Sequence, residues 1–152
     1  MGTKTKNVIY VRWLIRKDMP AINEINIEAS YQLLEEDITK MLRQRNVAGM
    51  VVELDEVVAG YMIYALEKGS IDLYHLVIDP VFHGQGLGTA LIETLKTRLG
   101  TSQGRTAIYT TVSEYDVQAQ VFFRAVKFFC VETIRGWDEN GDGYLFEYAQ
   151  YD

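Results

Sequence analysis

The stretch His83–Gly88 reads His-Gly-Gln-Gly-Leu-Gly and lies between an apolar segment that ends at Ile78 and an amphipathic segment that starts at Leu87. Its alternate glycines let the backbone turn sharply and approach a ligand closely, because glycine has no Cβ. A helix N-terminus presents unpaired N–H groups and the positive end of the helix dipole, so backbone amides can bind a pyrophosphate there. The pattern therefore predicts a strand, a phosphate-binding loop and a helix.

Two better-known phosphate loops fit this stretch less well. A P-loop ends in Gly-Lys-Ser or Gly-Lys-Thr, whereas Thr89 follows Gly88 directly here. A Rossmann site has its glycines after the first strand of a βαβ unit, with an acidic residue at the end of the next strand. Here antiparallel strands are expected before the loop, and the next strand contains Ile-Tyr-Thr-Thr-Val at residues 108–112. A glycine-rich loop that only connects a strand to a helix stays an alternative.

The rest of the chain predicts an α/β (mixed α+β) fold with a central sheet of about seven strands and helices on both faces. Runs of β-branched and aromatic residues indicate strands, and apolar residues at helical spacing indicate helices. Asp18 is expected to cap the first helix, and residues 31–34 to form a buried apolar connection. The predicted strands are residues 8–15, 48–54, 57–67, 70–78, 106–112, 129–137 and 144–150, and the predicted helices are residues 18–29, 35–45, 87–99 and 116–126.

Length and composition predict one domain, residues 8–152, after a flexible polar tail at residues 1–7. A chain of 152 residues that is 48% hydrophobic suffices for one core. The net charge of −6 argues against nucleic acid as a partner and favours a positively charged partner, such as a free amine or a peptide N-terminus. No apolar run approaches the roughly 20 residues that span a bilayer, and no signal peptide is evident. We therefore expect a cytoplasmic protein that has no membrane partner and is a monomer or homodimer.

Metal and thiol chemistry are not expected. Cys130 is the single cysteine, so no internal disulfide forms, and two histidines with one thiol do not suggest a zinc site. In an alternating strand, Cys130 is predicted to be a small apolar packing residue. Residues 138–143 resemble the first half of an EF-hand loop, but its twelfth position is Ala149 rather than Glu. The segment is therefore predicted to be a hairpin turn that binds no metal.

The sequence around the glycines resembles motif A of the GNAT superfamily of acetyltransferases. Residues 76–80 (Leu-Val-Ile-Asp-Pro) and 83–91 carry this likeness, and the order of elements extends it over nearly the whole chain. Residues 116–128 resemble a later segment of the family. Among its branches, the chain is most similar to the ribosomal-protein-alanine N-acetyltransferases. The resemblance implies a GNAT-type domain that uses acetyl-CoA as cosubstrate, with strands that splay apart at the cofactor.

The resemblance also implies how the substrates are held. The backbone at the end of the strand would bind the pantetheine amides, and the glycine loop would bind the diphosphate. The acceptor amine would attack the thioester directly, without a covalent acyl-enzyme. The expected cofactor-binding residues are Leu76, Val77, Ile78, His83, Gly84, Gln85, Gly86, Leu87, Gly88, Thr89, Asp116 and Phe123.

The chain departs from the family at several functional positions. The tyrosine that protonates the leaving thiolate is Phe123 here, and the catalytic glutamate of the ribosomal branch falls on Thr111. Neither side chain can perform that proton transfer. Asp116 replaces the family asparagine, Lys127 replaces a glycine, and His83 replaces the usual Arg or Gln of the loop. The catalytic pair of the family therefore does not carry over.

Asp72, His75 and Tyr115 are the candidate catalytic residues. Asp72 lies on the strand before the loop, about where the histone acetyltransferase branch has its glutamate base. Strand alternation points His75 to the opposite face. A solvated aspartate and a core histidine are the structural alternatives. Tyr115 or Tyr109 would replace the missing hydroxyl, although a thiolate can also leave into water without an acid.

The acceptor is a primary amine in the leading hypothesis. The resemblance places the 31–34 connection and the 138–143 hairpin at the border of the acceptor site, so Tyr31 and Trp137 are predicted to bind the acceptor. A protein N-terminus or a lysine is the first candidate, and a small amine is the second. A domain that binds acyl-CoA without catalysis is the third reading, which Phe123 and Thr111 favour.

Overall fold

The computed structural model describes residues 7–150, and its elements follow the predicted order. The predicted tail falls outside these residues, except for residue 7. The strands are β1 (Ile9–Trp13), β2 (Val47–Leu54), β3 (Val57–Leu66), β4 (Gly69–Ile78), β5 (Arg105–Ser113), β6 (Phe129–Asp138) and β7 (Gly141–Ala149). The helices are α1 (Met19–Glu28), α2 (Glu35–Leu42), α3 (Leu87–Lys96) and α4 (Val117–Ala125). None of these helices is long and apolar enough to cross a membrane.

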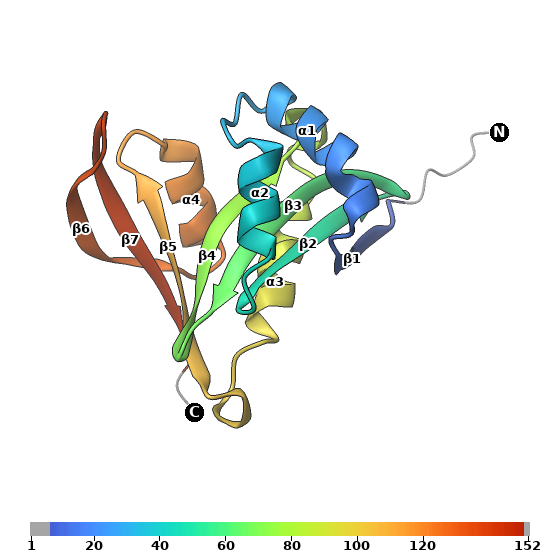
Figure 1. Cartoon of the computed structure of the whole chain (residues 1–152). Coiled ribbons are helices and arrows are strands. Elements are labelled where there is room, and N and C mark those ends of the chain that lie inside the picture. The colour runs from blue at the N-terminus through green and yellow to red at the C-terminus, as the bar shows by residue number, and fades with distance from the viewer. Residues whose placement is uncertain (1–6, 151–152) are drawn as a thin grey trace. The chain divides into compact units, whose positions relative to one another are not determined.

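The seven strands form one mixed sheet in the order β1-β2-β3-β4-β5-β7-β6 (Figure 1). β1 pairs antiparallel with β2, and β7 pairs antiparallel with both β5 and β6. β4 and β5 pair in parallel over Gly69–Asp72 of β4. The predicted mixed α/β fold with about seven strands is therefore confirmed.

The chain divides into two compact units. Unit 1 contains the described residues up to Tyr64 together with His75–Thr94, and unit 2 contains Ala65–Tyr74 together with the chain from Leu95 onward. The strand β4 and the helix α3 each contribute residues to both units. The single domain expected for residues 8–152 stays a prediction.

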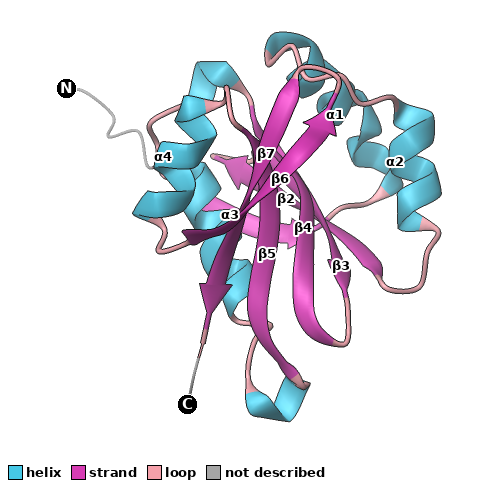
Figure 2. Ribbon diagram, turned by 90° about the vertical axis from the view of Figure 1, so that its left-hand side faces the viewer, coloured by secondary structure: helices cyan, strands magenta, loops and turns pink. Residues whose placement is uncertain are grey.

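Unit 1 has helices on both faces of its strands. In Figures 1 and 2, α2 and α3 lie on opposite sides of β3. Ile22 of α1, Ile38 of α2 and Leu91 of α3 are fully buried, as their helical spacing predicts. The connection before α2 is less buried than expected, because Leu34 is 62% exposed.

Asp18 does not cap α1 with its side chain, contrary to the prediction. Its carboxylate accepts two hydrogen bonds from Arg12, at 2.9 and 2.8 Å, and a third from the N–H of Ile15 at 2.8 Å. Arg12 also donates to Glu53 at 2.7 Å. The hydrogen bonds from Arg12 hold the pKa of the buried Asp18 carboxyl below its ordinary value. Asp18 therefore ties β1 to the start of α1 through an ion pair.

Unit 2 is built on the ladder of β5, β7 and β6. α4 packs on it through Phe123, whose ring centre lies 5.2 Å from that of Phe128 and 6.2 Å from that of Phe146. Cys130 is exposed, so its predicted packing role is wrong. The reason is that β6 is the edge strand of the sheet, and an edge strand buries less of its surface than an inner strand.

We expect Asp18→Asn to lower the free energy of unfolding by about 2 kcal/mol, because the guanidinium loses its buried carboxylate partner. The wild-type advantage should be present at neutral pH and disappear as the pH falls through the lowered pKa of Asp18. Urea unfolding of both proteins from neutral to acidic pH measures this difference. Asp37→Asn on the exposed face of α2 is the control, and an equal loss there would contradict the role of the ion pair.

Candidate functional site

The glycine loop connects the end of β4 to the start of α3 within unit 1. The Asp79 side chain accepts a hydrogen bond from the N–H of Val81 at 3.0 Å and so caps the short helix Pro80–Phe82. The backbone then adopts left-handed conformations at Gly84 (φ +80°) and Gly86 (φ +81°). Both positions require glycine, since other residues adopt this conformation only at a cost.

The loop is open on the side where the glycine side chains would be. A Cβ built on Gly84 or Gly86 meets no atom of the protein within 4 Å. The N–H of Ala90 donates to the carbonyl of Gly86, so the helical hydrogen bonds begin there. The first N–H groups of α3 therefore have no partner inside the helix. Backbone N–H groups at a helix N-terminus beside an open loop can bind an anion.

His83 links the loop back to the strand. Its Nε2 lies 3.2 Å from the carbonyl oxygen of Ile78, and a carbonyl only accepts, so Nε2 carries the proton and donates. The end of β4, from which the loop starts, lies close to β3. The N–H of Asp79 donates to the carbonyl of Ala59, and a Cβ on Gly60 would stand 2.8 Å from the carbonyl oxygen of Val77. The absence of a side chain at Gly60 thus lets the predicted pantetheine-binding segment approach β3.

Tyr31 and His75 meet in unit 1. The sequence predicts an acceptor-binding role for Tyr31 and a catalytic role for His75, but the Tyr31 hydroxyl oxygen lies 2.6 Å from Nδ1 of His75. Their rings pack edge to face, with centres 5.7 Å apart. Burial lowers the pKa of His75, so the imidazole is neutral at physiological pH. With its proton on Nε2, the neutral ring accepts the Tyr31 O–H at Nδ1, and the pair can take up a proton.

A buried amide positions Tyr31, and no sequence pattern pointed to it. Asn26 of α1 is 6% exposed, and its Oδ1 accepts a hydrogen bond from the Tyr61 hydroxyl at 2.7 Å. Its Nδ2 donates to the carbonyl of Leu33, and its own carbonyl accepts from the N–H of Tyr31. Asn26 therefore fixes the connection between α1 and α2 at two points and directs Tyr31 toward His75.

Asp72 lies in unit 2, opposite Tyr109 in the parallel ladder of β4 and β5. Burial and the negative charge of Glu67 raise the pKa of its half-buried carboxyl. A carboxylate with a raised pKa is a better proton acceptor near neutral pH than an exposed one. The Tyr109 hydroxyl donates a hydrogen bond to the carboxylate of Glu147 at 2.6 Å. Its proton is therefore directed at Glu147 rather than toward a leaving thiolate.

Trp137 lies against the main chain of β7 in unit 2. A Cβ on Gly143 would stand 2.7 Å from Cγ of Trp137 and 2.8 Å from the methyl carbon of Thr111. Thr111, at the position of the family glutamate, therefore has its methyl group on the same side of the sheet as the indole. Trp137 is 42% exposed, which leaves part of its ring accessible to a ligand.

The remaining predicted residues of unit 2 have local structural roles. Tyr115 is 69% exposed, and its N–H donates to the Ser113 hydroxyl. Asp116 caps α4 by accepting the N–H of Ala119 at 3.1 Å. Phe123 is 6% exposed and packs in the aromatic core below α4. Their proposed contacts with substrates stay predictions.

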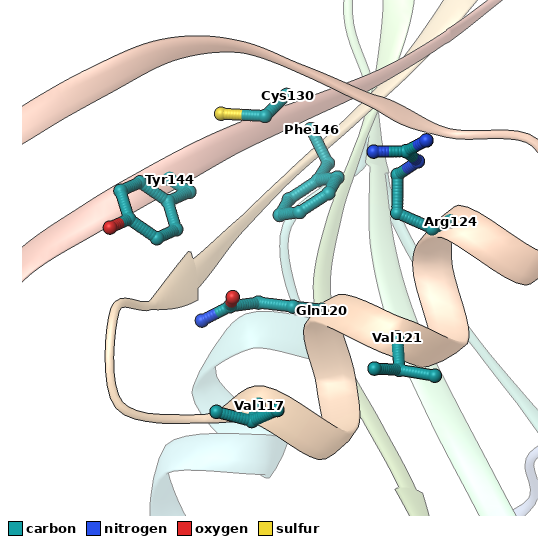
Figure 3. A pocket seen from close by; sticks show the side chains of 7 residues that line it. All are labelled: Val117, Gln120, Val121, Arg124, Cys130, Tyr144 and Phe146. Carbon is teal, nitrogen blue, oxygen red and sulfur yellow. The ribbon is translucent and has the colours of Figure 1, made fainter.

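A hollow of about 440 Å³ lies between α4 and the strands β6 and β7 (Figure 3). Its lining is mostly apolar, and the guanidinium of Arg124 lies 5.3 Å from the centre of the Phe129 ring. None of the predicted site residues lines this hollow, but the ring centre of Phe146 in its lining lies 6.2 Å from that of Phe123, a predicted cofactor-binding residue. Its lining residues are Val117, Gln120, Val121, Arg124, Cys130, Tyr144 and Phe146.

The described residues contain no group of three His, Cys, Asp or Glu side chains that could hold a metal ion. The glycine loop is suited to anion binding, and the Tyr31–His75 pair is suited to proton transfer. A direct transfer of an acyl group to an amine requires an acceptor for the proton of the amine.

A protein-family model described as the acetyltransferase (GNAT) family matches residues 10–128 of the chain. This range begins within β1, includes the glycine loop and ends just before β6. No curated protein sequence is significantly similar to the chain.

Solved structures of acetyltransferases share the fold. Ribosomal-protein-S18-alanine N-acetyltransferase from Escherichia coli superposes with a TM-score of 0.81 and 17% identity over 95% of this chain and 96% of its own. NAA60 from Arabidopsis thaliana in complex with acetyl-CoA has a TM-score of 0.80 and 15% identity, over 93% and 99%. Another Arabidopsis thaliana structure, in complex with the bisubstrate analogue CoA-Ac-MVNAL, has a TM-score of 0.76 and 15% identity, over 93% and 98%.

We expect the stability of the protein to fall as the pH drops below about 6.5, because the unfolded chain protonates His75 more readily than the folded chain does. His75→Gln removes this proton uptake. Urea unfolding between about pH 7.5 and pH 5 should therefore show the stability difference between wild type and variant narrowing toward acid. A difference that is constant or widens toward acid would contradict a buried neutral imidazole.

Proposed function

This chain belongs to the acetyltransferase (GNAT) family, as its motif A predicts, and on that premise we propose that it acetylates a primary amine. The acetyl donor is acetyl-CoA, and the first candidate acceptor is a protein N-terminus or a lysine side chain. The single observation that carries the proposal is the open glycine loop at the start of α3.

The loop residues fit a diphosphate group. Gly84 and Gly86 have no protein atom within 4 Å of the position of a Cβ, so a ligand can approach their main chain. The first N–H groups of α3 have no partner inside the helix, and the helix dipole favours a negative charge at this end. Two of the structures that share the fold are complexes with acetyl-CoA or with a CoA-containing analogue, which supports this assignment.

The bound acetyl-CoA supplies a thioester, whose carbonyl carbon forms a bond to the amine nitrogen as the bond to sulfur breaks and the thiolate leaves. The protein must hold the amine and accept its proton. We assign the proton transfer to the Tyr31–His75 pair. The Tyr31 oxygen accepts a proton from the amine while its own proton passes to Nδ1 of His75. The lowered pKa of His75 keeps the imidazole available as an acceptor at neutral pH.

Two of the structures that share the fold favour a peptide acceptor over a small amine. The Escherichia coli relative is by name an N-acetyltransferase of a ribosomal-protein alanine. Another relative was solved with the bisubstrate analogue CoA-Ac-MVNAL, in which MVNAL reads as a peptide sequence. The net charge of −6 also attracts an acceptor with a positive charge.

Gly86→Ala should weaken the binding of acetyl-CoA by roughly tenfold or more, because the new methyl group occupies open space through which a ligand would approach the main chain of the loop. Isothermal titration calorimetry measures the affinity. Gly69→Ala is a matched control, since Gly69 also has a positive φ (+84°) and no atom within 4 Å of its Cβ position. Both variants should lose similar stability from backbone strain, but equal affinities for acetyl-CoA would contradict the loop as the binding site.

Release of free CoA thiol should depend on the acceptor when the protein is incubated with acetyl-CoA. A panel of peptides with different N-termini, a lysine peptide whose N-terminus is blocked and a set of polyamines separates the acceptor classes. Stimulation by peptides but not polyamines supports the proposal. Stimulation by polyamines alone identifies a small-amine acetyltransferase, and tight binding of acetyl-CoA without any stimulation identifies a binding domain.

Tyr31→Phe should lower kcat/KM for the acceptor by roughly 100-fold while the affinity for acetyl-CoA is unchanged, because only the proton path is removed. In the wild type, kcat/KM should rise with pH through the lowered pKa of His75, and this limb should be lost in His75→Gln. Tyr115→Phe and Asp72→Asn are the comparison variants. A large loss in either, together with a normal Tyr31→Phe, would assign the proton transfer elsewhere.

A further inference from the structure

The sheet has two edge strands, β1 and β6, and only β6 is built to resist pairing with a further strand. The register of β6 against β7 shifts between Cys130 and Glu132 and again between Ile134 and Asp138. The charged side chains of Glu132 and Arg135 lie at these irregular places. Bulges and charged side chains hinder the addition of another strand to an edge, so β6 is protected twice.

β1 has neither protection. It pairs with β2 in regular register over all five of its residues. Its single charged side chain, Arg12, is bound to the carboxylates of Asp18 and Glu53 in its own chain. The strand is nevertheless exposed, and the large apolar or aromatic side chains that it presents to solvent are Ile9 (38% exposed), Tyr10 (57%) and Trp13 (51%).

The main-chain groups of β1 alternate between β2 and the open side of the sheet. The N–H of Asp55 donates to the carbonyl of Val8, and the N–H of Leu14 donates to the carbonyl of Gly49, each at 2.9 Å. In an antiparallel pair, residues bonded in this way alternate with residues whose N–H and C=O groups point away from the partner strand. Among the described residues, no strand pairs with β1 on that side. The outward-pointing residues are Ile9, Val11 and Trp13.

The side chains of these three residues extend a buried row of β2 to the edge of the sheet. Ile9, Val11 and Trp13 stand opposite three buried apolar residues of β2, and opposed residues share one face of a sheet. The buried partners are Leu54, Val52 and Met50. The core row of unit 1 therefore ends in side chains that a further strand would cover.

We propose that a second copy of this chain occupies the edge, and that the two β1 strands pair antiparallel about a two-fold axis at Val11. Val11 then stands opposite Val11 of the second copy, and Ile9 stands opposite Trp13. Cross-strand pairs of aromatic and β-branched residues stabilise a sheet. On the other face of the strand, Tyr10 stands opposite Arg12, and an aromatic ring attracts a guanidinium group.

The sequence of β1 is self-complementary in this register. A shift of two residues in one direction places Arg12 opposite Arg12, and like charges that are directly opposed destabilise a sheet. A shift of two residues in the other direction moves Trp13 past the end of the second β1, to a position opposite Asn7. The register centred on Val11 is therefore the one in which all three outward-pointing residues pair with one another.

The charges at the two ends of β1 are also complementary. The exposed residues Arg16 and Lys17 follow the end of the strand, and the exposed turn of Asp55 and Glu56 lies beside its start. An antiparallel arrangement brings the end of one β1 to the start of the other. Basic groups of one copy thus approach acidic groups of the second, which favours this orientation of the two chains.

Sedimentation velocity of the full chain tests the proposal with a pair of charge variants. The wild type should be a dimer at roughly 100 μM. Ile9→Lys with Trp13→Lys places like charges opposite each other between the copies and should raise the dissociation constant by roughly tenfold or more. Ile9→Lys with Trp13→Glu removes the same two side chains but places opposite charges there, so it should dimerise clearly better than the first variant. Residues 9 and 13 lie about 13 Å apart along one strand, so this difference arises between copies.

A disulfide between the copies tests the register with less disruptive changes. Cys130→Ser removes the single thiol of the chain. In that background, Val11→Cys should form a covalent dimer on mild oxidation, because directly opposed residues have Cα atoms about 5.5 Å apart. Ile9→Cys is the matched control, since the two copies of Ile9 would lie roughly 13 Å apart, which is too far for a disulfide.

A monomeric wild type would overturn the proposal and assign the edge to another occupant, such as a strand of a different protein. A dimer that both charge variants retain equally, or that oxidation links equally at Val11→Cys and Ile9→Cys, would also overturn it, because the copies would then meet at another surface. Circular dichroism shows whether the charge variants are folded, and the cysteine pair decides if they are not. These measurements use no acetyl transfer, so their failure leaves the proposed function standing.

Discussion

The parallel pairing of β4 with β5 ends at Asp72. Where this pairing ends decides which candidate residues of β4 lie in unit 2, with Asp72, and which lie in unit 1, with His75. The Thr110 hydroxyl donates to the carbonyl of Leu73 at 3.0 Å, which holds the first half of β4 in unit 2. The second half belongs to unit 1 and continues through His75 and Ile78 into the glycine loop. One strand thus places the Asp72 carboxylate among unit 2 residues, and His75 and the glycine loop among unit 1 residues.

Glycine serves two distinct physical purposes in this molecule. At Gly84 and Gly86 it allows a left-handed backbone, and the space in front of it is empty. At Gly143 the backbone is ordinary, and the missing side chain is the space that an indole and a methyl group fill. The first kind leaves room for a ligand, whereas the second leaves room for another part of the same protein. Only a structure distinguishes the two, since both are a single letter in the sequence.

Sequence reasoning predicted what depends on local pattern and missed what depends on distance. Alternation and helical spacing predicted the strands, α3 and the mixed sheet. The role of Asp18 was wrong because a helix start next to an aspartate predicts a cap, whereas the ion pair with Arg12 requires β1 to pack beside it. Cys130 was expected to be buried because alternation does not reveal which strand is at an edge. Asn26 and Tyr61 are far apart in sequence, and no sequence motif predicts the hydrogen bond between them.

The exposure of Cys130 on β6 makes the chain a convenient object for chemical labelling. It is the only thiol in the sequence, and its side chain is one of those that line the hollow beside α4. A maleimide dye or a spin label would therefore attach at one known position without any engineered substitution. The same thiol also reacts with the reagents that detect CoA, so each protein molecule contributes one equivalent of background colour to such an assay.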